Sequence, residues 1–201
     1  MINSEQRHAP ATLRNRDAIV SVLRDILPES GTILEIASGT GEHAVYFGQS
    51  FPNLQFQPSD PDLGNHGSIA AWTKREDMTN VLPPLPLDAL APAWDITPPT
   101  AIICINMIHI SPWEATIGLF EKAAGLLKPG CPLFLYGPYF CNDAEVAQSN
   151  LDFDRILKSR DLRWGIREVS DVDALAEKTG FKRNHLIEMP ANNLSLIYER
   201  T

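Results

Sequence analysis

A short apolar run that breaks into glycines and then continues with helix-compatible residues is the feature that most constrains this chain. Residues 32–37 are suited to a buried strand, and Ser38-Gly39-Thr40-Gly41 follows them directly. Glycine has no Cβ, so this turn can be tight, and its backbone N–H groups can meet an anionic ligand near the start of the next helix. The pattern predicts a strand, a glycine-rich turn and a helix that together bind a nucleotide-like cofactor.

Strand and helix patterns alternate along the rest of the chain. Apolar residues with helical spacing occupy positions 19, 22, 23, 26 and 27. Further strands are predicted at residues 54–57, 85–87, 100–108, 132–136, 182–189 and 194–198, and further helices at 41–49, 68–75, 113–127 and 171–179. This alternation predicts an α/β doubly wound sheet in a single domain, residues 1–201.

One segment departs from the alternation. Residues 137–170 show no clear period, and an irregular insert at 138–170 is predicted to wall a substrate pocket. Ligands of open α/β sheets bind beyond the carboxyl ends of the strands, which is where this insert begins.

Charge and cysteine usage narrow the function classes. The net charge of −8 argues against binding of a nucleic acid backbone. Cys104, Cys131 and Cys141 have no metal-ligand spacing, so neither a metal site nor a disulfide framework is predicted. The polar N-terminus lacks a signal-like apolar region, and no apolar run is long enough to span a membrane. We expect a cytoplasmic protein that acts on a small molecule, with no nucleic acid or membrane partner.

Two cofactors are compatible with the glycines. Gly39 to Ala44 matches G-x-G-x-x-G/A, and Asp60 lies 19 residues after Gly41, as in a dinucleotide site. S-adenosylmethionine also presents a ribose diol and a polar end to such a loop. Glu35 favours the second cofactor. A carboxylate inside a strand is costly unless several donors satisfy it, and a dinucleotide site usually keeps this strand apolar. A site for S-adenosylmethionine commonly has an acidic residue here, which faces the amino end of the methionine moiety.

These residues resemble motif I of the class I S-adenosylmethionine-dependent methyltransferases. The matching pattern is Glu35-x-Ala37-x-Gly39-x-Gly41, in which the general motif has glycine at the position of Ala37. The resemblance implies a Rossmann-like, mostly parallel seven-stranded sheet with an antiparallel C-terminal strand. More narrowly, the chain resembles a small methyltransferase-like family of unassigned substrate, in which alanine is the usual residue at this position. The stretches that carry the narrower resemblance are residues 13–16, 36–41, 57–60, 106–113, 164–167 and 189–194.

The resemblance implies roles for individual residues. Asp60 matches the acid that binds the ribose, and Asp88 matches a position that contacts the adenine amino group. The full set implied for the cofactor is Arg14, Asn15, Glu35, Ala37, Ser38, Gly39, Gly41, His43, Asp60, Asp88 and Asn106. The set projected near the substrate is Tyr139, Asn142, Asn150, Trp164, Arg167 and Asn192. Arg167 at such a place would suit an anionic substrate group.

Methyl transfer from a sulfonium is a direct displacement, so the protein mainly has to align the reacting groups. Such orientation can supply about 7–11 kcal/mol. Asn106 and His109 are the predicted catalytic residues, with Asn106 orienting the acceptor and His109 serving as general base. A purely structural His109 is an equally open interpretation. Two other functions remain open, an NAD-dependent oxidoreductase and a non-catalytic S-adenosylmethionine-binding module.

Overall fold

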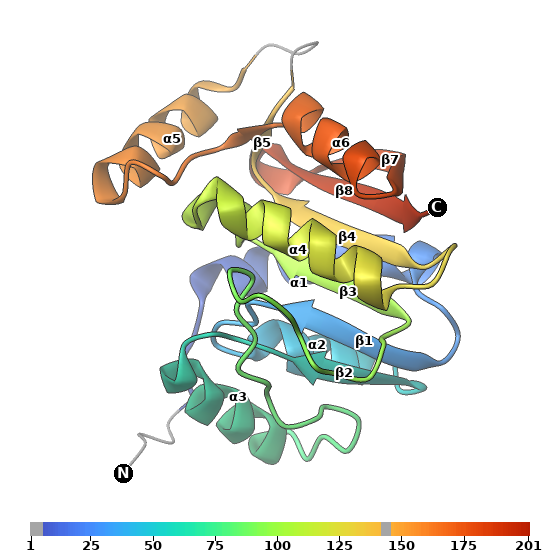
Figure 1. Cartoon of the computed structure of the whole chain (residues 1–201). Helices are drawn as coiled ribbons and strands as arrows, with labels where there is room; N and C mark the ends of the chain where they lie inside the picture. Colours follow the sequence, from blue (N-terminus) through green and yellow to red (C-terminus); the bar gives the residue numbers. More distant parts are fainter. Residues whose placement is uncertain (1–5, 142–145) are drawn as a thin grey trace. The chain divides into compact units, whose positions relative to one another are not determined.

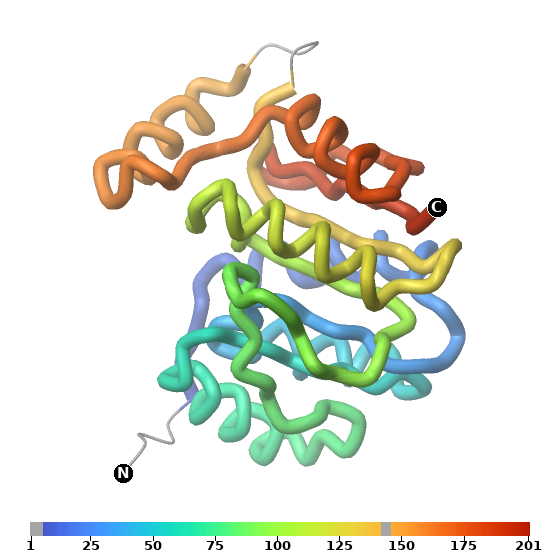
Figure 2. The backbone as a smooth tube through the Cα atoms, viewed as in Figure 1, coloured from blue at the N-terminus to red at the C-terminus, as the bar shows by residue number. Residues whose placement is uncertain are grey.

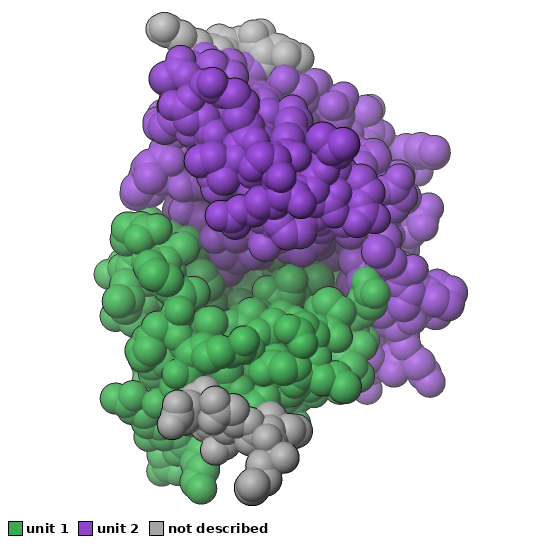
Figure 3. Space-filling model, turned by 90° about the vertical axis from the view of Figure 1, so that its left-hand side faces the viewer, with its two compact units in different colours: residues 1–88, 98–104 green, residues 89–97, 105–201 purple. Residues whose placement is uncertain are grey.

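A computed structural model describes residues 6–141 and 146–201 of the chain (Figure 1 and Figure 2). It divides into two compact units, coloured separately in Figure 3. Unit 1 comprises residues 1–88 and 98–104, and unit 2 comprises residues 89–97 and 105–201. Over the described residues, no helix is long and apolar enough to cross a membrane.

Unit 1 is built around three parallel strands. β1 (Gly31–Ile36) pairs in parallel with both β2 (Leu54–Pro58) and β3 (Ala101–Ile105). The helices of this unit are α1 (Pro10–Ile26), α2 (Glu42–Ser50) and α3 (Leu63–Arg75). Buried apolar residues of the strands and helices, such as Ile33 in β1 and Phe47 in α2, form its core. The predicted order of strand, glycine turn and helix is confirmed.

The strand predicted at residues 85–87 is wrong. Only isolated bridges form here, Phe56 with Val81 and Ser59 with Leu85. Prolines at positions 83, 84 and 86 have no N–H to donate, so a continuous ladder cannot form.

Unit 2 carries the antiparallel part of the fold. β8 (Asn193–Arg200) pairs antiparallel with β4 (Pro132–Gly137) and with β7 (Phe181–Met189). The helices α4 (Trp113–Leu126) and α6 (Val169–Lys178) belong to the same unit. The antiparallel C-terminal strand is therefore confirmed. Over the described residues the larger sheet has six strands, not the predicted seven.

The insert is more regular than predicted. It contains the helix α5 (Gln148–Arg160) and a separate parallel pair, β5 (Tyr139–Phe140) with β6 (Arg167–Glu168). The prediction of an irregular segment at 137–170 is therefore wrong.

The side chains of α5 explain that error. Leu151, Phe153 and Ile156 are substantially exposed, whereas Asn150 and Asp154 are buried. A helix that buries polar groups and exposes apolar ones lacks the apolar stripe by which a helix is found in a sequence.

The strand predicted at residues 100–108 is shorter in the structure. β3 ends at Ile105, and the short helix η1 (Ile108–Ile110) follows. Asn106 adopts a left-handed backbone with φ of 59°, which ends the extended conformation.

Candidate functional site

The glycine turn after β1 is left-handed at three positions. Ala37 and Gly39 have φ of 56°, and Gly41 has φ of 89°. A Cβ on Gly41 would lie 2.8 Å from the Cα of Ile69 in α3, so this glycine is required by packing. A Cβ on Gly39 would meet nothing within 4 Å, which leaves open space beside the turn.

Serine side chains hold the turn against the end of β2. The N–H of Ser38 donates to the carbonyl of Ser59 over 2.8 Å, and the N–H of Ser59 donates to Ser38 Oγ over 3.1 Å. Ser59 Oγ in turn donates to the carbonyl of Glu35 over 2.7 Å. The turn is thereby fixed before any ligand binds.

Asp60 organises the same turn with its carboxylate. Oδ2 accepts the N–H of Gly39 at 2.8 Å, and Oδ1 accepts the N–H of Asp62 at 2.9 Å and Asn65 Nδ2 at 2.8 Å. An ionised carboxylate has about four acceptor positions, so one remains for a further donor such as a hydroxyl. The structure thus places Asp60 directly beside the glycine turn.

Glu35 has an unusual environment for a carboxylate. Its side chain is buried, and that burial raises its pKa from 4.5 to about 7; a hydrogen bond from Ser38 opposes the rise and the charge of Asp60 adds to it. Among the described residues, Glu35 Oε2 has no hydrogen-bond partner. A buried acceptor of this kind costs free energy unless a donor reaches it. An ammonium group of a ligand would supply that donor and would also favour the charged carboxylate.

Four other predicted cofactor residues of unit 1 lie outside the glycine turn. Arg14 and Asn15 are in α1, His43 is in α2, and Asp88 lies in the segment after α3. Asn15 Oδ1 lies 2.9 Å from His43 Nε2, and burial together with the charge of Arg16 lowers the pKa of His43 to about 4. Both of these side chains are therefore engaged with each other. Arg14 and Asp88 are exposed.

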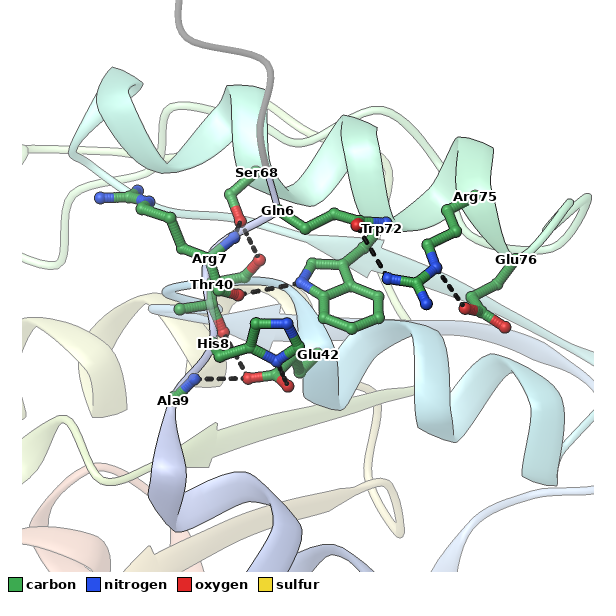
Figure 4. Close-up of polar contacts among 10 residues, drawn as sticks. All are labelled: Gln6, Arg7, His8, Ala9, Thr40, Glu42, Ser68, Trp72, Arg75 and Glu76. Atoms are coloured by element: carbon green, nitrogen blue, oxygen red, sulfur yellow. Dashed lines mark hydrogen bonds and ion pairs between the residues drawn. The ribbon is translucent and has the colours of Figure 1, made fainter.

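Residues 6–9, which we name the N-terminal strap, also contact this region (Figure 4). Arg7 N–H donates to Ser68 Oγ over 2.9 Å, and Trp72 Nε1 donates to the carbonyl of Arg7 over 3.0 Å. His8 Nδ1 lies 2.9 Å from Glu42 Oε1, and the N–H of Ala9 donates to Glu42 Oε2. The strap is thus tied to the residue that directly follows the glycine turn.

The strap contacts were not predicted from the sequence. Glu42 is buried at the start of α2, and Ser68 Oγ donates to the carbonyl of Thr40 over 2.8 Å. These partners are separated by about 30 residues or more along the chain, so no local pattern signals them. The sequence itself shows only that an acidic residue, Glu42, directly follows the glycines.

In unit 2, Gly137 brings together the two predicted catalytic residues. A Cβ on Gly137 would lie 3.2 Å from His109 Nδ1 and 3.7 Å from Asn106 Oδ1. The N–H of Asn106 donates to the carbonyl of Tyr136 over 2.8 Å. Asn106 and His109 therefore lie beside the carboxyl end of β4.

The imidazole of His109 is held in its neutral form. The residue is buried, and burial lowers its pKa to about 4, with a smaller contribution from the charge of Arg167. The ring packs edge-on against Phe153 with 5.7 Å between centroids. A neutral imidazole has one nitrogen that can accept a proton.

A cavity of about 220 Å³ follows β4 in the same unit. Of the predicted substrate residues, Tyr139, Asn150 and Asn192 line it. Trp164 and Arg167 do not, and Asn142 lies outside the described residues. The other lining residues are Phe140, Cys141, Val146, Ala147, Glu188, Met189, Asn193 and Leu194.

Arg167 is engaged with the backbone instead. Its Nη2 donates to the carbonyls of Ser111 and Arg163, each over 2.8 Å. The guanidinium also lies 5.7 Å from the centroid of the Trp113 ring. These contacts link Arg167 of β6 to the residue after η1 and to the loop after α5.

Solved structures of methyltransferases resemble this fold. The mitomycin 7-O-methyltransferase MmcR matches with a TM-score of 0.79 at 17% identity, over 95% of this chain and 54% of that one. An O-methyltransferase family protein from Burkholderia thailandensis matches with the same TM-score and identity, over 95% of this chain and 57% of that one. CalO1, a methyltransferase in calicheamicin biosynthesis solved with S-adenosylhomocysteine bound, matches with a TM-score of 0.72 at 12% identity, over 95% of this chain and 55% of that one.

These likenesses show a shared fold, and the chain spans about half the length of these solved chains. At the level of sequence, a family model described as "Protein of unknown function (DUF938)" matches residues 6–200.

Proposed function

The chain belongs to the DUF938 family, and from its fold and its glycine turn we propose that it transfers a methyl group from S-adenosylmethionine to a small-molecule acceptor. The observation that carries this proposal is the buried Glu35, whose Oε2 lacks a partner among the described residues beside a fixed left-handed turn. S-adenosylmethionine carries an ammonium group that would satisfy this carboxylate. A nicotinamide dinucleotide presents phosphates to such a turn, and a buried acid there would repel them.

Within unit 1, the proposed cofactor residues have distinct tasks. Glu35 receives the ammonium group, and the remaining acceptor position of Asp60 receives a ribose hydroxyl. Ala37, Ser38, Gly39 and Gly41 shape the turn, and the open space at Gly39 admits the ligand. The roles of Arg14, Asn15, His43 and Asp88 rest on the family resemblance.

Within unit 2, Asn106 and His109 are the proposed acceptor-side residues. When bound, S-adenosylmethionine supplies an already activated methyl group, so the protein has to orient the acceptor and exclude water. The amide of Asn106 can donate to or accept from the acceptor. The neutral His109 can take the proton that an attacking hydroxyl or amine releases.

Thermal unfolding with matched concentrations of S-adenosylmethionine, S-adenosylhomocysteine and NAD tests the proposal. A ligand at about 100 times its Kd stabilises the folded state by about 2.7 kcal/mol. For a chain of this size that corresponds to a rise in Tm of roughly 5–11 °C. We expect the rise with both sulfur compounds and not with NAD, and its loss in Glu35→Gln but not in the control Glu29→Gln, an exposed glutamate. A rise with NAD alone would support the oxidoreductase and contradict the proposal.

Binding without turnover would favour a non-catalytic module. Transfer is measured as conversion of S-adenosylmethionine to S-adenosylhomocysteine in the presence of a pool of small molecules, with methylated products detected by mass. His109→Gln is expected to lower kcat while leaving the affinity for S-adenosylhomocysteine unchanged.

A further inference from the structure

The cavity of unit 2 has a defined place in the fold. Its near wall, Tyr139 and Phe140 of β5, begins two residues after the end of β4, and its far wall is the turn between β7 and β8. Ligands of open α/β sheets bind at this edge, beyond the carboxyl ends of the strands. Gly137, the last residue of β4, is the residue against which Asn106 and His109 lie.

The turn that forms the far wall is strained. Ala191 and Asn192 both have a left-handed backbone, with φ of 60° and 57°. Left-handed backbone is unfavourable for residues other than glycine and asparagine, and it persists where the surroundings impose it, often at ligand sites. Here α5 holds the turn, because Asn150 Nδ2 donates to the carbonyl of Asn192 and Asn192 Nδ2 donates to Ser149 Oγ, each over 3.0 Å.

These hydrogen bonds use the amide donors of the cavity lining. Asn150 and Asn192 donate as described, and Asn193 Nδ2 donates to the carbonyls of Pro190 at 3.0 Å and Ala191 at 3.3 Å. Within the described part of the chain, no donor reaches the Oδ1 atoms of these three asparagines. The amides therefore offer the cavity mainly acceptor oxygens.

The charge of the lining has the same preference. Among the described lining residues, Glu188 is the one with a charged side chain, and the lining contains no lysine, arginine or histidine. Arg167 donates to two backbone carbonyls elsewhere in unit 2. A carboxylate or phosphate in this cavity would face acceptor oxygens and a like charge, whereas an amine would meet partners.

We propose that this cavity binds the methyl acceptor, and that the acceptor is a small, single-ring-sized molecule carrying an amine or ammonium group and not a carboxylate or phosphate. Its volume of about 220 Å³ is below the roughly 300–1,000 Å³ typical of ligand pockets, which sets the size. That the bound molecule is methylated rests on the proposed function. The preference for an amine over an acid is independent of the proposed function, because a binding measurement alone tests it.

Three probes of one skeleton test the preference: tyramine, 4-ethylphenol and 4-hydroxyphenylacetate. They share a phenol ring and a two-carbon side arm but are cationic, neutral and anionic. Their Kd values for the full chain, without cofactor, are measured by saturation-transfer NMR at pH 7.5. We expect tyramine to bind about tenfold more tightly than 4-hydroxyphenylacetate, with 4-ethylphenol between them.

Matched variants assign the effect to the cavity. Glu188→Gln and Glu177→Gln remove the same charge from exposed positions, and only Glu188 lines the cavity. We expect Glu188→Gln to remove most of the advantage of tyramine and Glu177→Gln to leave it. Equal or tighter binding of 4-hydroxyphenylacetate, no binding of any probe, or equal effects of the two variants would overturn the inference. Loss of S-adenosylmethionine binding with the amine preference retained would instead contradict the proposed function alone.

Discussion

Replacement of Glu35 by glutamine is expected to stabilise the ligand-free protein, increasingly as pH rises from 4.5 to about 7 and by a constant amount above that. In the folded state the pKa of Glu35 is about 7, against 4.5 for the unfolded chain. Between these values the folded state binds more protons than the unfolded state, so stability falls as pH rises through this window. At about 1.4 kcal/mol per pKa unit, the charged carboxylate costs the folded protein about 3 kcal/mol at pH 8.

The side chain of glutamine does not ionise, so the variant has no buried charge at this position at any pH tested. Wild type and Glu35→Gln should have similar free energies of unfolding at pH 4.5. At pH 8 the variant should be more stable by about 3 kcal/mol, or roughly 6–12 °C in Tm. Urea unfolding at pH 4.5, 6, 7 and 8 measures the difference, and groups that titrate equally in both proteins cancel from it.

The exposed Glu29→Gln is the control and should show no such trend. A difference between wild type and Glu35→Gln that is the same at every pH would refute the reasoning. So would a variant that is less stable than wild type at pH 8, because the carboxylate would then have a stabilising partner.

Three further changes test the turn and the acceptor side. Gly41→Ala should destabilise by about 1–3 kcal/mol more than Gly39→Ala in urea unfolding, because both carry left-handed strain but only Gly41 meets the backbone of Ile69; equal losses would contradict this. Ala37→Gly should stabilise by up to about 1 kcal/mol, since it relieves a left-handed alanine, and a loss of stability would show that the methyl group has a packing role. His109 has a pKa of about 4 in the folded state against 6.5 in the unfolded chain. The unfolded state therefore binds more protons between these values, and the folded protein loses stability as pH falls from 6.5 towards 4. His109→Gln should lose less stability than wild type over that range in urea unfolding, and equal losses would contradict this.

The parallel half of the fold was predictable because its signals are local. The strand, glycine turn and helix at residues 31–50 need only an apolar run, residues that tolerate left-handed backbone and a helical period. The antiparallel end was also predictable, because β7 and β8 are adjacent in sequence and joined by a short turn.

Two predictions of secondary structure failed, for different physical reasons. The apolar residues at 85–87 suggest a strand, but the neighbouring prolines have no backbone N–H to donate, so only an isolated bridge forms. The prediction misses α5 because Asn150 and Asp154 are buried through hydrogen bonds to Asn192 and Ile166, which lie outside the helix and which its own pattern cannot reveal.

Some contacts of the candidate site could be predicted from the sequence and others could not. The closeness of Gly39 to Asp60 follows from two neighbouring parallel strands that end at the same edge, and it was predictable. The N-terminal strap was not, because Arg7 meets Ser68 across 61 residues of sequence. Residue type alone suggests an anionic substrate as the partner of Arg167, and only the structure shows that its Nη2 donates to two backbone carbonyls.

The central claim is that the turn after β1 binds S-adenosylmethionine. Its most direct test is a titration of ¹⁵N-labelled protein with S-adenosylhomocysteine, followed by amide chemical shifts. We predict saturable shifts concentrated at Ile36 to Gly41 and at Asp60, and their absence in Glu35→Gln at the same ligand concentration. No shift at these amides, or shifts that NAD reproduces at the same positions, would contradict the claim.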